Sequence, residues 1–266
     1  MNNTWKKIRV VTLPKFGNDG TKEKDESYYS LDGKTVLFNS YSVKGAVFGT
    51  FVHCMGFAKD KNKCYRAGSA YKGANPETFE ILNYHFAKDK NNIYSLDGIV
   101  KNVDYETFEV LDSGFEISSD GLRISKLSFS SDKSGIWWMD YYSYKPVLIK
   151  GTNKNTFQRI DDRFSKDDKQ VYFGGIRLPK ANPATWKRLH ENAYYSQDQN
   201  RIYFTNNLLK EADAETFKVL PVSLSTGILS YAKDKNWGYI TGRIVTHEEL
   251  EQRIQEDSKH LEGLKK

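Results

Sequence analysis

One nine-residue pattern recurs along the chain and constrains its fold more than any other feature of the sequence. Residues 57–65 read FAKDKNKCY and residues 86–94 read FAKDKNNIY, so nearly the same motif is written twice, 29 residues apart. An active site needs one nucleophile or one acid, whereas a motif that recurs at a regular spacing marks a structural unit that stacks on copies of itself. The repetition therefore predicts a repeat protein.

Seven copies of the motif align on its first aromatic residue. The third position after that residue is always aspartate, the seventh is small or branched and hydrophobic except at Gly238, and the eighth is aromatic except at Leu37. The copies begin at Tyr29, Phe57, Phe86, Phe129, Phe164, Tyr195 and Tyr231, and their aspartates are Asp32, Asp60, Asp89, Asp132, Asp167, Asp198 and Asp234. The alignment defines an internal repeat of about 30 residues, a period typical of repeat architectures.

Each motif predicts a β-hairpin. Its aspartate can accept a backbone N–H two residues further on, in an Asx turn, and the Asn or Gly that follows tolerates positive φ. A second pattern, Asx-x-x-Thr-aromatic, lies between motifs at residues 74–79, 103–108, 152–157, 181–186 and 212–217. Its Asx residues are typical N-caps, with Pro76 and Pro183 at the first helical position, so we expect a helix of one or two turns there.

One such unit has too little apolar surface to fold alone, so consecutive units must stack. The predicted fold class is a mainly β repeat protein, with tandem units of a β-hairpin plus a short helix in an open curved array. The alternative is closure like that of a β-propeller, since residues 28–38 and 116–125 are similar to propeller motifs. Propeller blades usually need about 40 residues for four strands, which favours the open array.

The two ends of the chain depart from the repeat. We expect an N-terminal extension at residues 1–28, the hairpin-repeat domain at 29–245 and a C-terminal capping helix at 246–266. Thr246 and Glu249 have the spacing of a capping box. A partial apolar stripe follows, made of Leu250, Ile254, Leu261 and Leu264. The stripe predicts that this helix covers the last repeat, and a helix that binds a partner is the alternative.

The repeated letters resemble those of the bacterial DKNYY repeat family. AKDKNKCY, AKDKNNIY and AKDKNW, each near an Asx-x-x-Thr-aromatic pattern, carry the resemblance, which covers residues 57 to 240 or so. Most copies here have one tyrosine where the family name implies two. The resemblance implies no established catalytic residues, and some members look like companions of secreted toxins or like envelope proteins.

Bulk properties favour a soluble protein that stays where it is made. The formal net charge is +6, from 40 Lys and Arg against 34 Asp and Glu, and the apolar runs are too short to insert into a membrane. Residues 1–16 have no apolar core typical of a signal peptide, so we expect a cytoplasmic protein, or a periplasmic or envelope protein if a signal precedes this sequence. Cys54 and Cys64 are too few for a disulfide framework, and Cys64 occupies a buried hydrophobic column.

No pattern in the sequence predicts catalysis, a cofactor or a metal site. The five histidines lie in no nucleophile or metal frame. The repeated aspartates are interpreted as turn formers, and calcium ligands are the weaker alternative because lysines alternate with them and no distal Glu follows. The aromatic residues fall in core columns, which favours packing over base stacking, and we expect no nucleic acid partner.

We therefore predict a non-enzymatic protein-binding module, in its narrower form an immunity protein that neutralises a bacterial toxin by direct binding. An envelope or carbohydrate-binding repeat or propeller protein is the alternative. Two stretches, 141–160 and 173–190, carry cations and no acid, so we expect a partner with an acidic surface. The candidate partner-binding residues are Tyr141, Tyr142, Tyr144, Arg159, Arg177, Lys187 and Arg188. For the tyrosines, packing of their own loop is the alternative.

Overall fold

The seven motifs form seven β-hairpins in the computed structural model of the chain. The structure describes residues 4–8, 29–118, 121–125, 127–140, 143–161, 163–222 and 228–263. In every hairpin the residue after the first aromatic pairs with the eighth position, as Ala58 does with Tyr65 and Ser165 with Tyr172. The contacts divide the chain into two units, Met1–Lys150 and Gly151–Lys266, and each is described by itself.

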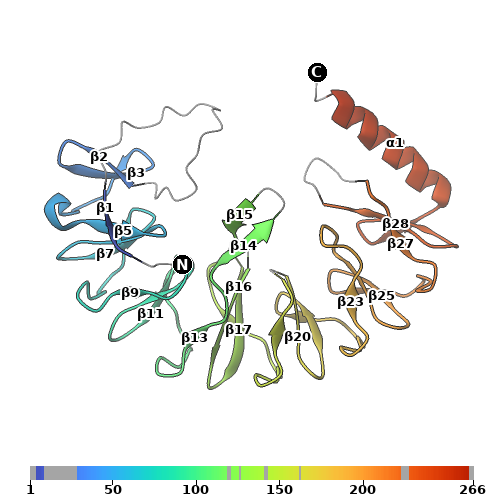
Figure 1. Ribbon diagram of the computed structural model, residues 1–266, viewed down its shortest axis with the longest axis horizontal. Coiled ribbons are helices and arrows are strands. Elements are labelled where there is room, and N and C mark those ends of the chain that lie inside the picture. The colour runs from blue at the N-terminus through green and yellow to red at the C-terminus, as the bar shows by residue number, and fades with distance from the viewer. Residues whose placement is uncertain are drawn as a thin grey trace. The chain divides into compact units, whose positions relative to one another are not determined.

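Unit 1 contains four of the motif hairpins, each extended into a small antiparallel sheet (Figure 1). A two-stranded hairpin, β14–β15, is inserted into the fourth sheet. The elements are β1 (Lys6–Lys7), β2 (Tyr29–Asp32), β3 (Thr35–Phe38), β4 (Tyr41–Ser42), a 3₁₀ turn (Phe48–Thr50), β5 (Val52–Cys54), β6 (Phe57–Lys59), β7 (Cys64–Arg66), β8 (Ser69–Ala70), β9 (Glu80–Ile81), β10 (Ala87–Lys88), β11 (Ile93–Ser95), β12 (Gly98–Ile99), β13 (Glu109–Val110), β14 (Phe115–Ser118), β15 (Gly121–Ile124), β16 (Leu127–Asp132), β17 (Gly135–Asp140) and β18 (Val147–Leu148).

Unit 2 contains three sheets, each of four strands in chain order, and one helix. The elements are β19 (Gln158–Arg159), β20 (Phe164–Lys166), β21 (Val171–Phe173), β22 (Ile176–Arg177), β23 (Lys187–Arg188), β24 (Tyr195–Gln197), β25 (Ile202–Phe204), β26 (Asn207–Leu209), β27 (Lys218–Val219), β28 (Tyr231–Lys233), β29 (Gly238–Ile240), β30 (Arg243–Val245) and α1 (His247–Gly263). No sheet among the described residues of either unit closes on itself.

The predicted short helices do not form. Asn75 Oδ1 accepts the N–H groups of Glu77 and Thr78 at 2.9 and 3.3 Å, as an N-cap would, but only one turn follows. The chain then enters β9, where Glu80–Ile81 pairs with β10 and adds a strand to the hairpin. Four strands fit into a single repeat because most of them are very short, so the length argument against four-stranded units was wrong.

The core lies between consecutive sheets. Phe57 and Cys64 of one sheet pack with Ala87 and Tyr94 of the next, and Phe79 from the intervening turn completes the cluster. Cys64 is completely buried, and burial raises the pKa of its thiol to about 12. Because each sheet fills its neighbour's core, stacking supplies the apolar burial that one unit lacks.

Helix α1 covers the last sheet, as predicted. Thr246 and Glu249 form the capping box, with hydrogen bonds of 2.8 and 3.1 Å. Leu250 is buried against Gly238, where an added Cβ would lie 2.8 Å from the leucine Cβ. The packing of this helix therefore explains the glycine that breaks the hydrophobic column. Ile254 is half-buried, Leu264 lies outside the described residues, and the side chain of Leu261 is not described.

At the other end of the chain, β1 adds Lys6–Lys7 to the edge of the second sheet through β5. The rest of the expected extension, residues 1–3 and 9–28, lies outside the described residues.

Candidate interaction surface

Each sheet has two chemically different ends, and the repeated aspartate builds one of them. Asp89 Oδ1 accepts the N–H groups of Asn91 and Asn92 at 2.8 and 2.9 Å. Its Oδ2 accepts the N–H of Asn75 at 2.8 Å and the hydroxyl of Tyr94 at 2.9 Å. One buried carboxylate therefore joins its own turn, the preceding Asx turn and the aromatic eighth position.

We call this arrangement the hub. Its contacts with the two turns recur in six copies, and five of these also have the tyrosine hydroxyl, while the fourth motif has Trp137 in that place. The hub is absent from the first copy, where Asp32 is exposed. The hub carboxylates are 5 % exposed or less, and each accepts a backbone N–H from the turn before its sheet. The hub aspartates are Asp60, Asp89, Asp132, Asp167, Asp198 and Asp234, and the turn residues that donate to them are Val47, Asn75, Asp104, Asn153, Asn182 and Asp213. We call this end of each sheet the hub end.

The electrostatics of the hubs follow from burial opposed by hydrogen bonds. Burial alone would raise the pKa of Asp60, Asp89 and Asp234, but N–H and O–H donors favour the charged form and hold each pKa below its ordinary value. The same burial and the neighbouring carboxylate raise the pKa of the partner Tyr94. The interpretation of the aspartates as turn formers is confirmed.

The threonine of the second pattern completes the hub end. Thr78 Oγ1 accepts the N–H of Lys90, the residue after Asp89, at 3.1 Å. The same bond joins Thr50 to Lys61, although Val47 stands where other copies have Asx. The sequence pattern missed this sixth turn. The aspartate, the aromatic residues and the threonine of the repeated signature therefore have roles in the scaffold.

The opposite end of each sheet, which we call the loop end, consists of the loops that join strands one to two and three to four. In the first of these loops a polar side chain again accepts N–H groups, but its identity varies. Asn83 Oδ1 accepts from His85 and Phe86 at 2.8 Å, and Asp161 Oδ1 accepts from Arg163 and Phe164 at 2.6 and 2.7 Å.

In the fourth sheet this loop contains the β14–β15 hairpin. Asp112 still accepts the N–H groups of Gly114 and Phe129, at 2.8 and 2.5 Å, so the loop keeps its anchor across the added residues 115–128. His85 fixes the base of the hairpin, because its Nε2 lies 3.0 Å from the carbonyl oxygen of Ser125. The loop end therefore varies among the copies both in its side chains and in the length of its loops.

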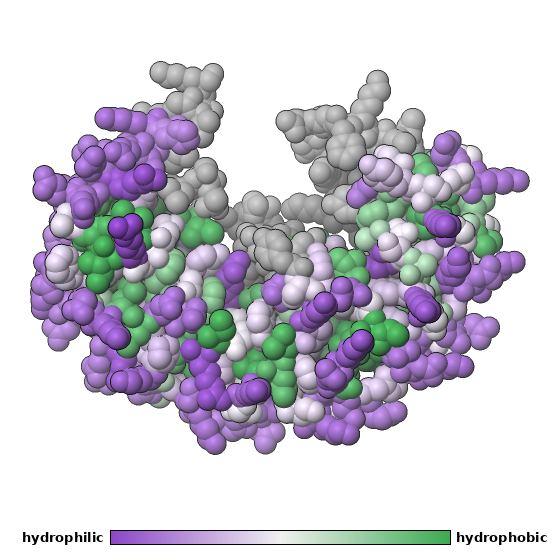
Figure 2. All heavy atoms as spheres, turned by 180° about the vertical axis from the view of Figure 1, so that it is seen from behind, coloured by the Kyte–Doolittle hydropathy of each residue, from purple (hydrophilic) through white to green (hydrophobic). Residues whose placement is uncertain are grey.

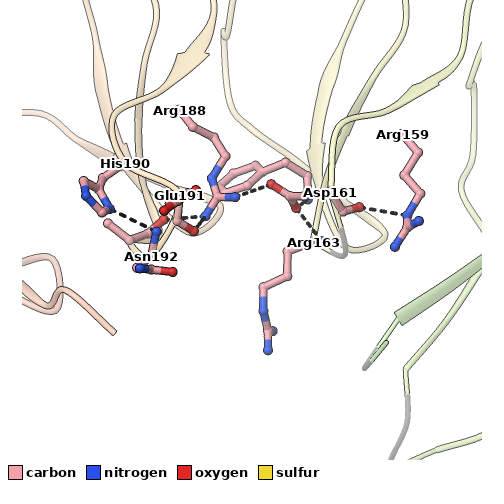
Figure 3. A network of polar contacts seen from close by, with 9 residues as sticks. Arg159, Asp161, Arg163, Arg188, His190, Glu191 and Asn192 are labelled. Carbon is pink, nitrogen blue, oxygen red and sulfur yellow. Dashed lines mark hydrogen bonds and ion pairs between the residues drawn. The ribbon is translucent and has the colours of Figure 1, made fainter. Parts of the chain in front are cut away.

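Two predicted residues, Arg159 and Arg188, meet at the loop end of unit 2 around Asp161 (Figure 3). Arg188 Nη1 lies 2.5 Å from Asp161 Oδ2, and its Nη2 donates to the carbonyls of Glu191 and Ala193 at 2.6 and 2.9 Å. Arg159 Nε donates to the Asp161 carbonyl at 3.0 Å. These bonds hold the loops of two neighbouring sheets together.

The other predicted residues are not brought to this network. Arg177 and Lys187 are exposed on the edge strands β22 and β23. Tyr144 is half-buried and packs on the cluster that contains Phe86, so packing explains it. Tyr141 and Tyr142 lie outside the described residues.

Sequence reasoning missed the ring contacts of the loop end. The guanidinium of Arg163 lies over the ring of Tyr194 at 4.9 Å, and Tyr194 in turn contacts Phe173 and Phe204. Arg163 and Tyr194 precede the first aromatic residue of their motifs, in a column that varies among the copies, so no repeated letter marks them. Among the described residues, no group of three or more His, Cys, Asp and Glu side chains is placed to hold a metal ion. No described helix is both long and apolar enough to cross a membrane.

Comparison with protein families gives a match that covers most of the chain. The model of the DKNYY family matches residues 57–207 and 195–260. The match spans the hub-bearing sheets from β6 onward and part of α1. Comparison with curated proteins and with solved structures gave no match.

Proposed function

The chain belongs to the DKNYY family, and on that premise we propose that it is a non-enzymatic protein-binding module that recognises its partner with the loop ends of its sheets. The supporting observation is the contrast between the two ends. The hub end repeats the bonds between the aspartate and its two turns in six copies, whereas the loop end changes its side chains and its length from copy to copy. Variation and insertions in repeat proteins map to loops on one face, which is often the binding face.

Three arginines at the loop end of unit 2 are candidate anchors for a partner with an acidic surface. Arg159, Arg163 and Arg188 lie there together with Asp161 and Glu191, and the Asp161 carboxylate already accepts three hydrogen bonds. Figure 2 shows hydrophobic residues on the displayed face as separate patches among hydrophilic side chains. Such a surface fits recognition through a few arginine and aromatic anchors within a polar rim.

The narrower form of the proposal is an immunity protein that covers the active site of a bacterial toxin. Its support is the family resemblance together with the arginines of the loop end. In this form the partner is an enzyme, and binding of the loop end abolishes its activity.

Affinity purification from the bacterium that encodes the chain tests the proposal. We expect one stoichiometric partner protein, and we expect Arg163→Glu to weaken its recovery because this cation lies in the β19–β20 loop of the loop end. Lys169→Glu is the control, since Lys169 is a cation at the hub end. Recovery of no protein, together with binding of a glycan or turnover of a small molecule, would overturn the proposal.

A further inference from the structure

One arginine breaks an aromatic column of the repeat. The ninth position after the first aromatic residue pairs with that residue across the hairpin, and in three copies it is a phenylalanine that stacks on it, as Phe173 does on Phe164 at 5.0 Å. The second copy has Arg66 there, and its guanidinium lies over the ring of Phe57 at 4.2 Å. Arg66 is the last residue of β7, so it lies at the loop end of unit 1. A cation therefore replaces the ring that other sheets use in their scaffold.

Arg66 is buried without an acidic counter-ion among the described residues. The residue is 5 % exposed, the ring of Tyr84 lies 4.6 Å from its guanidinium carbon, and its Nη1 donates to the carbonyl of Met55 at 2.6 Å. A buried charge that lacks a partner of opposite charge destabilises a fold, and contacts with rings offset only part of that cost. A residue that departs from its column at the expense of stability is expected at a functional site.

Part of the guanidinium remains accessible beside Gly56. Nε and Nη2 of Arg66 donate to no described residue, and neither nitrogen is fully enclosed. Gly56 has a φ of +76°, and an added Cβ there would lie 3.0 Å from Nη1 and 3.6 Å from Cζ of Arg66. The glycine that makes the β5–β6 turn therefore also leaves space next to the guanidinium. The N–H donors in the plane of a guanidinium match the two oxygens of a carboxylate.

The loops around Arg66 contain no acid of their own. They are residues 39–40, 55–56, 67–68 and 82–85, with the sequences NS, MG, AG and LNYH. The loop-end acids that follow along unit 1 are engaged elsewhere, since Asp97 pairs with Lys145 at 3.6 Å and Asp112 accepts N–H groups of its own loop. The local charge at Arg66 is therefore positive, unlike the mixed charge around Asp161 in unit 2.

The titratable groups whose pKa Arg66 affects are neutral at pH 7. Burial, followed by the charge of Arg66, lowers the pKa of His85 to about 4. Burial raises the pKa of Tyr29 to about 12, against smaller opposite effects of the Gly68 N–H and of Arg66. Burial likewise raises the pKa of Tyr71, with a smaller opposite effect of Arg66. Arg66 thus adds one uncompensated positive charge, which a single carboxylate neutralises and a doubly charged phosphate exceeds.

We propose that Arg66 binds a glutamate side chain of the partner protein at the loop end of unit 1. The carboxylate accepts hydrogen bonds from the Nε–H and Nη2–H groups, and the long glutamate side chain reaches a guanidinium that lies beneath the surface. This inference rests on the proposed function and names one contact through which the loop end of unit 1 performs it.

Substitution by the residue of the other copies separates a binding role from a scaffold role. Arg66→Phe restores the ring of the column, so we expect its urea midpoint to equal or exceed that of the wild type. A scaffold role predicts the opposite, because the Met55 hydrogen bond and the contact with Tyr84 would be lost. A midpoint well below that of the wild type would therefore assign Arg66 to the scaffold and refute the proposal.

NMR titration of the full chain with acetyl-Gly-Glu-Gly-amide tests the contact itself. We expect a saturable, salt-sensitive shift of the Arg66 Nε–H resonance, and no such shift with the matched peptide acetyl-Gly-Gln-Gly-amide. Arg66→Phe should bind about tenfold more weakly or not at all, whereas Lys63→Gln at the hub end of the same sheet should bind normally. The absence of a saturable shift, unchanged binding by Arg66→Phe, or tighter binding of inorganic phosphate than of the glutamate peptide would overturn the assignment.

The native partner separates this inference from the proposed function. We expect Arg66→Phe to reduce recovery of the partner about tenfold or more, as loss of a hot-spot arginine does. Recovery by the wild type and equally by Arg66→Phe refutes the Arg66 contact and leaves the binding module standing. Failure of the wild type to recover any protein refutes the proposed function itself.

Discussion

The hub end and the loop end are the two regions whose comparison explains this chain. At the hub end a buried carboxylate joins the same two turns in six sheets, and a threonine hydroxyl closes the same turn. At the loop end, Asn83, Asp112, Asp161 and His190 all accept N–H groups from their own loop, yet the residues between and beside them differ. The difference teaches that the repeat recorded in the sequence is the scaffold, and the residues that we propose for recognition are those that vary among the copies.

The largest expected effect comes from removing a hub carboxylate. Asp89→Ala leaves three backbone N–H groups and the Tyr94 hydroxyl without their acceptor, and each buried donor left unsatisfied costs about 1–3 kcal/mol. We expect unit 1 to lose about 3 kcal/mol or more of unfolding free energy, measured with urea. Asp97→Ala is the control, because Asp97 is exposed at the loop end of the same sheet, and it should change stability by less than about 0.5 kcal/mol. Equal effects of the two substitutions would break the comparison.

Acid should affect the two ends in separate pH windows. Burial, with a smaller contribution from Arg66, lowers the pKa of His85 from 6.5 to about 4. Between these two values the unfolded chain binds a proton at His85 that the folded chain does not bind. The contribution of neutral His85 to the free energy of unfolding is therefore complete above pH 6.5 and lost as the pH falls toward 4. The loss is on the order of 3 kcal/mol.

The hub carboxylates lose their contribution to stability at a lower pH than His85 does. The pKa values of Asp60, Asp89 and Asp234 lie below the ordinary 3.8, so their contribution is present above that pH and disappears only as the pH falls further. Urea midpoints measured from pH 7 to 3 should show the first loss in the wild type and a much flatter profile in His85→Phe. A His85→Phe profile that retains the full slope between pH 6.5 and 4 would contradict this assignment.

Removing a single tyrosine hydroxyl at each end should change stability by a smaller amount. Tyr94→Phe removes one of the two donors to Asp89 Oδ2, while the Asn75 N–H remains, so we expect a loss of about 1–2 kcal/mol. Tyr194→Phe keeps the ring that stacks on Arg163, and we expect less than about 0.5 kcal/mol. Thermal and urea unfolding of both variants measure the difference, and a larger effect at Tyr194 would reverse the assignment of the two ends.

A small effect on stability is expected at Arg163 of the loop end. Arg163→Gln loses a partly exposed contact with the ring of Tyr194, worth about 0.5–1 kcal/mol. A fall of about 2 kcal/mol or more, which is typical of a lost buried interaction, would show that Arg163 belongs to the scaffold. Urea unfolding of this variant beside the wild type makes that comparison directly.

The sequence predicted the hub end of this structure better than the loop end. The hairpins and turn-forming aspartates were predictable because their contacts are local: Asp89 accepts from residues two and three positions ahead. The prediction of short helices was wrong because an N-cap at Asn75 is compatible with a single turn as well as with a helix. Whether Glu80–Ile81 forms a strand depends on its pairing with β10, which is not encoded locally.

The candidate site was predicted only in part. Arg159 and Arg188 were found from a stretch of one-signed charge, but their meeting around Asp161 depends on how two sheets stack. Arg163 and Tyr194 were missed because they belong to different repeats, far apart in the chain, and neither occupies a repeated column. Counting the columns that vary, in addition to those that repeat, would have pointed to the loop end.

Site-resolved amide hydrogen exchange on the free chain tests the division between the two ends most directly. The N–H groups of Asn75, Asn91 and Asn92, which all donate to Asp89, should exchange only through unfolding of their unit, with the same free energy. Amides at the exposed tips of the loop end, such as those of Ser113 and Glu191, should exchange through local openings at far smaller free energies. Hub amides that exchange as fast as these loop tips would contradict the account.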